Sequence, residues 1–314
     1  TLDSSLGKDI NMSLPIISSP MDTVTGSDML RAMDSLGGLG IVHRYNTPEM
    51  QADLVREAIR MGSSNTGAAI GVSGDFLDRA RLLVDAGVKV LCVDIAHGHH
   101  TLMRHALKVL RNTFGSKIHI MAGNVATLEG LNDLSDWGAD SVRVGIGGGS
   151  ICSTRVQTGH GVPTLQSILD CSSTDRDVII VADGGIRNSG DIVKALAAGA
   201  DFVMLGSLLS GTDESPGEII FKDGERYKVY RGMASKDAQI DWRGHTASIE
   251  GVSSTVPEKG PVKNVLSEME TGIRSGLSYS GAQNILELQV NSKMIKQTFS
   301  GTAESSTHIS KIGV

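Results

Sequence analysis

The sequence predicts an α/β fold, a (β/α)8 or TIM barrel, and two observations lead to it. Eight apolar, strand-like runs occur before residue 206, and amphipathic segments of helical length separate most of them. Strands that are apolar along their whole length are typical of a parallel sheet covered on both faces. A chain of 314 residues has room for such a barrel, which commonly takes about 250. A doubly wound open sheet is the alternative that the same units permit.

The predicted strands are residues 14–18, 39–43, 68–72, 88–94, 117–122, 141–145, 178–182 and 202–205. Helical periodicity is clearest in residues 49–61, 76–86 and 191–198. A repeated pattern supports these assignments, because Gly87, Gly138 and Gly199 each follow a helix-like segment and precede an apolar strand. Glycine tolerates left-handed backbone at the end of a helix, so we expect a helix cap at each of the three.

The chain changes character after the eighth strand. Residues 218–230 predict a hairpin, with Asp223 and Gly224 at its turn. Residues 231–260, which we name the flap, are polar and rich in Gly and Ser without clear periodicity, as expected of a mobile functional loop. Helices are predicted near 261–275 and 282–292, and the Ser/Thr-rich tail from Thr298 is predicted to be loose. We expect residues 1–314 to form a single barrel domain, with C-terminal helices and tail in 261–314.

Composition excludes several functional classes. The formal charge of −6 disfavours a nucleic-acid binder, and 40% hydrophobic residues disfavour disorder. The 38 glycines, about 12% of the chain, lack the three-residue period of collagen. No apolar run reaches the roughly 18 residues of a membrane span, and the N-terminus has no apolar signal core. We therefore expect a cytoplasmic protein without membrane contact, in which Cys92, Cys152 and Cys171 are reduced.

Polar and glycine-rich motifs follow the predicted strands, which is where barrel enzymes carry their chemistry. Asp183-Gly184-Gly185 follows the seventh strand and Gly206-Ser207 follows the eighth. Glycine lets backbone N–H groups approach an anion, and a helix N-terminus adds favourable partial charge. These motifs therefore predict a phosphate site. The alternative is that the glycines only form tight turns.

Cys152 lies in a glycine-rich loop after the sixth strand, where Arg155 and backbone N–H groups favour a thiolate. It is therefore a candidate nucleophile, with a buried and inert thiol as the alternative. For Cys92 and Cys171, burial is the expectation. Asp94 ends the fourth strand, where its carboxylate either binds a ribose or caps a helix.

Two other groups of residues carry weaker signals. His97, His99 and His100 invite a metal site, but no acidic or thiol partner shows a metal-ligand spacing. A polar loop beside a ligand is the better interpretation of these histidines. Trp137 and Trp242 have faces on which a base can stack, although Trp137 is expected to pack on a helix.

Four motifs together resemble the IMP dehydrogenase/GMP reductase family: GIGGGSICSTRVQTGHGVP, ADGGIRNSGDIVKALAAGADFVMLGS, SPMDTV and YRGMAS. The resemblance covers about residues 14–309 and implies a TIM barrel, usually a homotetramer, that binds a purine nucleoside 5′-monophosphate such as GMP or IMP. It also implies a covalent bond between a catalytic Cys and purine C2, and hydride exchange with a nicotinamide cofactor. Many members insert small regulatory domains after the second strand, whereas here residues 48–61 lead directly to the third strand.

The resemblance also implies roles for particular residues. Cys152 is the implied nucleophile, and Thr154 and Glu250 are the implied proton relay. The residues that the resemblance implies as contacts of the phosphate are Ser150, Gly184, Gly185, Gly206, Ser207 and Tyr230. The ribose is expected to contact Asp183, and the base is expected to contact Ser19, Met21, Gly232, Met233 and Glu250. The resemblance implies that the cofactor contacts Asp94, Ile95, Ala96 and Asn124. It also implies that the carbonyl groups of Gly147, Gly149 and Cys152 bind a monovalent cation, K⁺.

The flap distinguishes the two activities of the family. Dehydrogenases carry an Arg-Tyr pair in a long flap, whereas this flap is short, lacks that pair and ends in EG-x5-P-x-KG, which resembles GMP reductase. The resemblance thus favours reductive deamination of GMP to IMP by NADPH. IMP dehydrogenase, which oxidises IMP to XMP with NAD, is the alternative, supported by YRGM and by Arg44, where reductases commonly have Lys. A nucleotide-binding protein without turnover is the third hypothesis.

Overall fold

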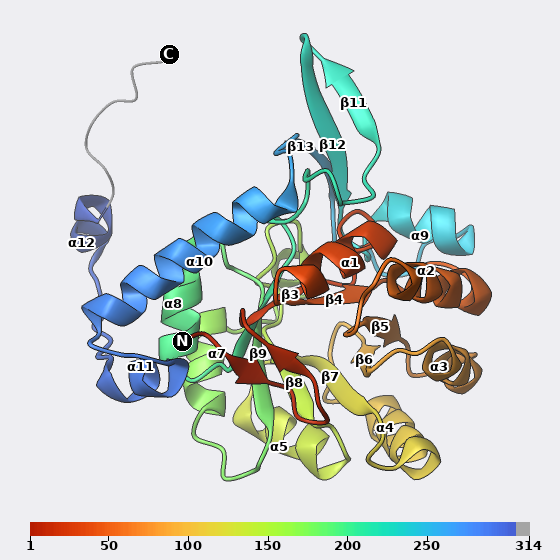
Figure 1. The fold of residues 1–314 in the computed structure, drawn as a ribbon, viewed down its shortest axis with the longest axis horizontal. Coiled ribbons are helices and arrows are strands. Elements are labelled where there is room, and N and C mark those ends of the chain that lie inside the picture. The colour runs from red at the N-terminus through yellow and green to blue at the C-terminus, as the bar shows by residue number, and fades with distance from the viewer. Residues whose placement is uncertain (306–314) are drawn as a thin grey trace.

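The computed structural model describes residues 1–305, and a closed barrel of eight parallel strands lies at its centre (Figure 1). The last strand pairs with the first and closes the ring, so the predicted TIM barrel is confirmed and the open sheet is excluded. The strands are β3 (Ile16–Ser18), β4 (Leu39–Val42), β5 (Gly67–Ile70), β6 (Val90–Asp94), β7 (His119–Val125), β8 (Ser141–Val144), β9 (Ile179–Asp183) and β10 (Phe202–Leu205).

The strands are apolar because both of their faces are covered. Ile41, Cys92 and Met121 belong to a fully buried cluster inside the barrel. Their neighbours Val42 and Leu91 belong instead to the larger cluster between the strands and the helices. Side chains that alternate between two buried layers leave few polar positions, and this explains the nearly continuous apolar runs in the sequence.

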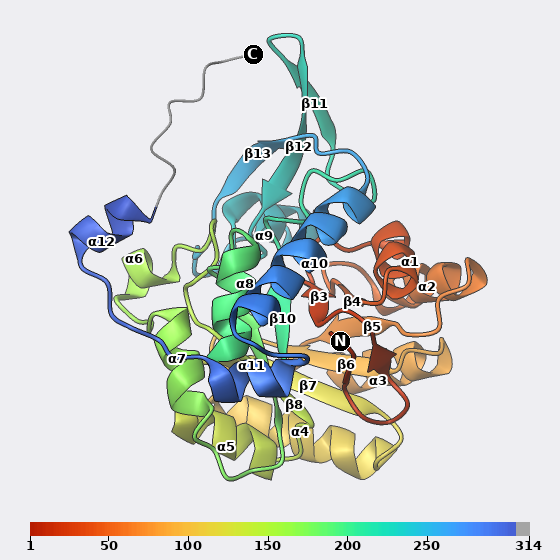
Figure 2. The same cartoon turned by 60° about the vertical axis from the view of Figure 1, so that its left-hand side comes forward.

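Helices alternate with the strands and cover the outside of the barrel (Figure 2). Thr47 and Asn188 begin two of them by accepting a hydrogen bond from a backbone N–H three residues later. Gly87, Gly138 and Gly199 follow helices with φ of 100°, 116° and 113°, as predicted. The helices are α1 (Ser27–Ser35), α2 (Pro48–Arg60), α3 (Phe76–Asp85), α4 (Thr101–Phe114), α5 (Leu128–Asp136), α6 (Thr154–Thr158), α7 (Thr164–Cys171) and α8 (Ser189–Ala197).

The connection between β4 and β5 contains α2 and no inserted domain, as predicted. The predicted hairpin is also present, as β11 (Ile219–Lys222) and β12 (Glu225–Arg231), and it projects from the barrel (Figure 1). Asp223 and Gly224 form its turn, with φ of 52° and 83°. None of the helices in residues 1–305 is both long and apolar enough to cross a membrane.

The flap is more regular than the sequence predicted. It contains α9 (Lys236–Arg243), which Ser235 caps, and β13 (Ser253–Pro257), which pairs antiparallel with β12. Its periodicity is weak because α9 buries only Ala238 and Gln239, while β13 is mostly exposed. Short elements that bury so little of their surface carry a faint hydrophobic pattern.

The C-terminal region holds α10 (Val262–Tyr279), α11 (Ile285–Asn291) and α12 (Phe299–Glu304). The first two correspond to the predicted helices, and α10 packs along α8 (Figure 2). The prediction of a loose tail is wrong for α12, which Thr298 caps through the N–H of Gly301. The rest of that prediction, residues 306–314, lies outside the described residues.

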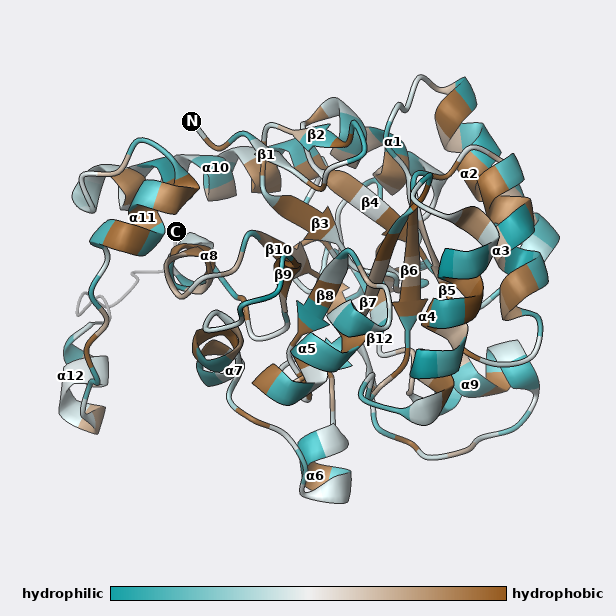
Figure 3. Ribbon diagram, turned by 90° about the horizontal axis from the view of Figure 1, so that it is seen from below, coloured by the Kyte–Doolittle hydropathy of each residue, from teal (hydrophilic) through white to brown (hydrophobic). Residues whose placement is uncertain are grey.

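A short N-terminal hairpin closes the end of the barrel at which the strands begin, and the sequence did not predict it (Figure 3). Its strands are β1 (Ser4–Ser5) and β2 (Asn11–Met12). Leu6, Ile10 and Met12 are buried with the side chains of the barrel interior. They keep water from the end of the barrel opposite the strand-end loops.

His119 lies in a polar cluster at this same end of the barrel, where the strands begin. Its Nε2 is 2.7 Å from the Ser141 hydroxyl, and Lys8 and Arg111 both bind the nearby carboxylate of Asp140, at 2.6 and 2.7 Å. Burial lowers the pKa of His119 to about 4, the charge of Asp140 opposes this, and Lys8 and Arg111 reinforce it. The folded protein therefore holds this imidazole neutral.

We predict that the protein loses stability as the pH falls from about 6.5 toward 4. In that window the unfolded chain binds a proton at His119 that the folded chain does not, which costs roughly 3 kcal/mol. Urea unfolding at a series of pH values measures this slope. The variant His119→Gln, which does not titrate there, should show a flatter profile, and an unchanged slope in that variant would contradict the assignment.

Candidate active site

A cavity of about 520 Å³ opens at the carboxyl ends of the barrel strands. It is lined by the loops that follow β3, β6, β7, β8, β9 and β10, and by the flap. Every residue that the sequence proposed for catalysis, substrate, cofactor or cation lines this one cavity. The strand ends bring these residues together although their positions range from Ser19 to Glu250.

Cys152 is exposed in the loop between β8 and α6, whereas Cys92 and Cys171 are buried as predicted. Burial raises the pKa of each buried thiol to about 12, so they remain protonated and inert. The flap lies against the loop of Cys152, because the N–H of Val252 donates to the carbonyl of Ile151 at 3.0 Å. Cys152 is therefore the accessible thiol of the three.

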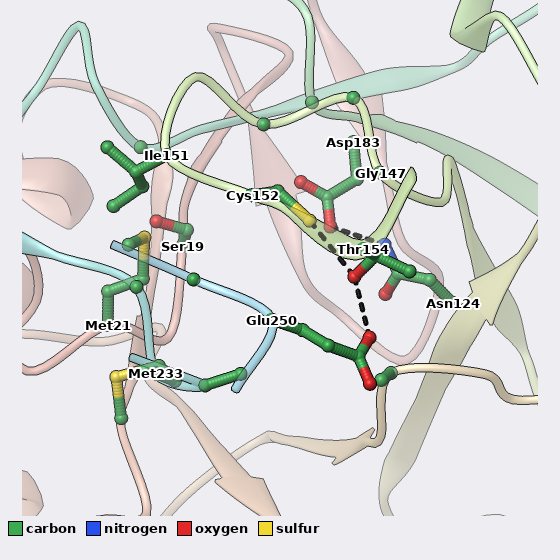
Figure 4. A pocket seen from close by; sticks show the side chains of 18 of the residues that line it. Ser19, Met21, Asn124, Gly147, Ile151, Cys152, Thr154, Asp183, Met233 and Glu250 are labelled. Carbon is green, nitrogen blue, oxygen red and sulfur yellow. Dashed lines mark hydrogen bonds between the residues drawn. The ribbon is translucent and has the colours of Figure 1, made fainter. Parts of the chain in front are cut away.

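A line of hydrogen bonds leads from Cys152 to the flap (Figure 4). The Cys152 Sγ is 3.3 Å from the Thr154 hydroxyl, and that hydroxyl donates to Oε2 of Glu250 at 2.8 Å. Thr154 lies in the first turn of α6, which places its hydroxyl beside the thiol two residues earlier. Such a chain of thiol, hydroxyl and carboxylate can move a proton between a nucleophile and a leaving group.

Backbone approaches itself closely at the loops after β9 and β10. Gly184 has a φ of 91°, and a side chain there would stand 3.0 Å from the backbone nitrogen of Gly149. At Gly206 a side chain would meet Ser19, Met21 and Tyr230, each at 3.2 Å. These glycines leave space at the cavity wall where backbone N–H groups can reach an anion, beyond the requirement of a tight turn.

Two side chains shape this part of the wall. Burial raises the pKa of Tyr230, so its hydroxyl remains a neutral donor. The Lys259 ammonium donates to the carbonyl oxygens of Ser207 and Leu208 at 2.7 and 3.1 Å, and so fixes the turn after β10. Sequence analysis missed Lys259, although it stands in the EKG end of the flap.

Arg143 joins two of the predicted site carboxylates. Its guanidinium is buried in β8 and binds Asp94 Oδ1 at 2.6 Å and Asp183 Oδ2 at 2.8 Å. Burial alone lowers the pKa of Arg143, but the charges of Asp183 and Asp94 outweigh it and hold that pKa above its usual value. Asn124 donates to the same oxygen of Asp183 at 2.8 Å (Figure 4). Asp94 caps no helix, because His100 is the cap of α4, the helix that follows β6.

The wall formed by the β3 loop holds an unpaired polar atom. The Ser19 hydroxyl oxygen is buried and has no hydrogen-bond partner within residues 1–305. Buried hydroxyl groups are almost always paired, so this atom points to a ligand that the cavity takes. Met21 and Met233 flank the same region, and the Asp22 N–H lies 3.3 Å from the Met233 sulfur (Figure 4).

Several cavity residues were not proposed from the sequence as site residues. Arg44 and Tyr45 come from the loop after β4, Arg187 from the loop after β9, and Gln239 and Arg243 from α9. Arg44 was noted as a departure from reductases. Its Nε is buried, has no hydrogen bond within the described part of the chain, and lies 4.0 Å from Oδ2 of Asp94. A basic residue directly after a predicted apolar strand was the available signal for Arg44, whereas Arg187 stands four residues after the end of β9.

The weaker sequence signals have structural roles. His99 pairs with Asp133 at 2.8 Å, and His100 accepts a hydrogen bond from the N–H of Leu102 at the start of α4. Within residues 1–305, no three His, Cys, Asp or Glu side chains cluster as metal ligands would. Trp137 packs on the core as predicted, and Trp242 stacks on Tyr45 with ring centroids 6.0 Å apart.

The chain is similar in sequence to known proteins. Residues 1–308 match the family model described as the IMP dehydrogenase / GMP reductase domain. The chain is 48% identical to inosine-5′-monophosphate dehydrogenase of Nitrosopumilus maritimus, over 79% of this chain and 55% of that one. It is 46% identical to GMP reductase of Leishmania major, over 87% and 58% of the two chains. This chain therefore spans little more than half the length of these two relatives.

A solved structure resembles almost the whole chain. It is a GMP reductase variant from Trypanosoma brucei in complex with guanosine 5′-monophosphate, with a TM-score of 0.92 and 30% identity. The likeness covers 98% of this chain and 93% of that one. Relatives with both activities thus lie at similar identity, so the choice between the activities has to come from the residues of the site.

Proposed function

The chain belongs to the IMP dehydrogenase/GMP reductase family, and from this premise we propose that it is a GMP reductase. It would convert GMP and NADPH to IMP, NADP⁺ and ammonia. The observation that carries the proposal is the hydrogen bond between Thr154 and Glu250 beside the Cys152 thiol. It gives a leaving amino group a proton donor next to the nucleophile.

The first half of the reaction releases ammonia. The Cys152 sulfur forms a bond to purine C2, and the bond between C2 and the amino nitrogen breaks. The thiol proton passes through Thr154 and Glu250 to that nitrogen, which is a poor leaving group unless protonated. Ser19, Asp183 and the glycine-rich loops after β9 and β10 would hold the base, ribose and phosphate of the nucleotide meanwhile.

The second half returns the enzyme to its starting state. When bound, NADPH would supply a hydride to C2; the Cys152 sulfur would then leave C2 as a thiolate and take up a proton. The cavity fits such a cofactor, because Asn124, Arg44 and Arg243 line it together with Cys152, and the two guanidinium groups suit phosphates. Flap contacts with the Cys152 loop would exclude the water that hydrolyses the covalent adduct to XMP.

The loop of Cys152 also fits a monovalent cation. The carbonyl groups of Gly147 and Cys152 accept no hydrogen bond within the described residues, and Gly149 accepts one, from the Cys152 N–H at 3.2 Å. Carbonyl oxygens are the ligands that K⁺ takes in proteins. Bound there, the ion would hold the loop that presents the thiol.

We also propose a cytoplasmic homotetramer. The hairpin of β11 and β12 supports association, because Ile219, Ile220 and Phe221 are exposed on it, Phe221 to 75%. Sedimentation of the purified protein tests the assembly.

IMP dehydrogenase is the second candidate, and the relatives with that name at similar identity favour it. Two incubations separate the candidates: GMP with NADPH, and IMP with NAD. We expect NADPH oxidation with ammonia release in the first and no XMP in the second. XMP formation without GMP turnover would overturn the reductase proposal. GMP binding without any turnover in either incubation would instead support a nucleotide-binding protein.

A further inference from the structure

The proposed reaction needs a path for protons between the closed site and water. The thiolate left after hydride transfer must be reprotonated in every turnover, and the released ammonia takes up a proton as well. Thr154 and Glu250 can pass a proton among themselves, Cys152 and the purine, but they do not by themselves bring one from solution. Glu250 is only half-buried, so its outer side is the place to look for that path.

Both carboxylate oxygens of Glu250 are engaged, one on each side. Oε2 accepts from Thr154 at 2.8 Å, and Oε1 accepts from the Ser248 hydroxyl at 2.9 Å. Ser248 is exposed and also lines the cavity, so its hydroxyl meets the carboxylate on one side and water on the other. The hydrogen-bonded order is Cys152, Thr154, Glu250, Ser248 and then solvent.

The backbone around Ser248 is fixed by the buried side chain of Gln239. Its amide nitrogen donates to the carbonyl groups of Ala234 and Ser248, at 3.0 and 2.9 Å, and its oxygen accepts from the Ala247 N–H at 2.8 Å. Only 3% of Gln239 is exposed. The loop before Glu250 is therefore held in place although its surface is open to water, as a preorganised site requires.

We infer that Ser248 is a positioning residue of the relay: it holds Oε1 of Glu250 and passes protons between water and the Thr154–Glu250 pair. This inference rests on the proposed function. A hydroxyl can do both, because it donates one hydrogen bond while accepting another. Ser248 accepts a proton from water as its own hydroxyl proton passes to Glu250. Glu250 then gives a proton to Thr154 as the Thr154 hydroxyl proton passes to the Cys152 thiolate.

The test compares Ser248→Ala, Ser248→Thr and the control Thr246→Ala in GMP and NADPH turnover. Thr246 is exposed in the same loop but does not line the cavity. For Ser248→Ala we expect kcat to fall about tenfold, less than for the loss of a general acid, with the KM for GMP changed less than about twofold. Imidazole buffer, as an outside proton carrier, should restore part of that rate. Ser248→Thr should restore most of it, and Thr246→Ala should match the unaltered enzyme.

Each outcome decides between the possibilities. Unchanged kcat in Ser248→Ala, or a loss that neither imidazole nor Ser248→Thr restores, would overturn the inference and leave the proposed function standing. Failure of the unaltered enzyme to oxidise NADPH with GMP would overturn the proposed function itself. The two failures are therefore distinguishable in one series of assays.

Discussion

We expect replacement of Cys152 by alanine to lower the proposed GMP turnover about 10⁴-fold or more, with GMP binding retained. Without the sulfur, no covalent bond to purine C2 forms. The only remaining reaction is hydride addition to a purine that no covalent bond activates. The proposed phosphate, ribose and base contacts should remain, because none of them uses the thiol. The measurements are NADPH oxidation followed by absorbance and GMP binding followed by calorimetry.

The other two cysteines supply the control. Cys171→Ala keeps the active site, so its turnover should stay near that of the unaltered enzyme. In the folded protein iodoacetamide should label Cys152 and spare Cys92 and Cys171, because both are buried and burial raises each pKa to about 12. GMP turnover that survives Cys152→Ala would contradict a covalent bond between Cys152 and the purine.

Glu250→Gln is expected to slow deamination of GMP by roughly 10²-fold or more, with a much smaller loss of GMP binding. Glutamine has nearly the same shape and can still accept the hydrogen bond from Thr154. It cannot take up and release the proton that the amino group needs in order to leave. Single-turnover release of ammonia measures the affected step directly.

Glu258→Gln is the matched control for this variant. Glu258 lies just after β13 and pairs with Arg226 at 2.8 Å, outside the cavity. It should leave the rate of ammonia release unchanged. An equal loss of GMP binding and of deamination in Glu250→Gln would show that Glu250 only binds the base.

The barrel could be predicted because its strands are buried on both sides. Their apolar runs are unbroken, and β10 was predicted to the residue. The N-terminal hairpin was missed because its few apolar residues are buried by a distant part of the chain, the barrel interior. Its turn runs through left-handed backbone at Gly7, Lys8 and Asp9, with φ of 74°, 53° and 64°, and only the first of these residue types favours that conformation.

The candidate site was predictable where its residues lie at the carboxyl ends of strands, as Asp94, Asn124 and Asp183 do. Arg143 was missed because it was counted as part of an apolar strand, where a charge in SVRV was the neglected signal. Gln239 and Ser248 could not be placed, because their partners are set by the path of the flap rather than by local pattern. Polar side chains in loops gain their roles from tertiary contacts.

The proposed reduction of GMP is tested by a single turnover of GMP with NADPH that carries deuterium at the transferred position. A GMP reductase yields IMP with one deuterium at C2, and the molar amount of ammonia released equals the molar amount of active sites. GMP left intact under these conditions, while IMP and NAD yield XMP, would contradict the proposed reduction.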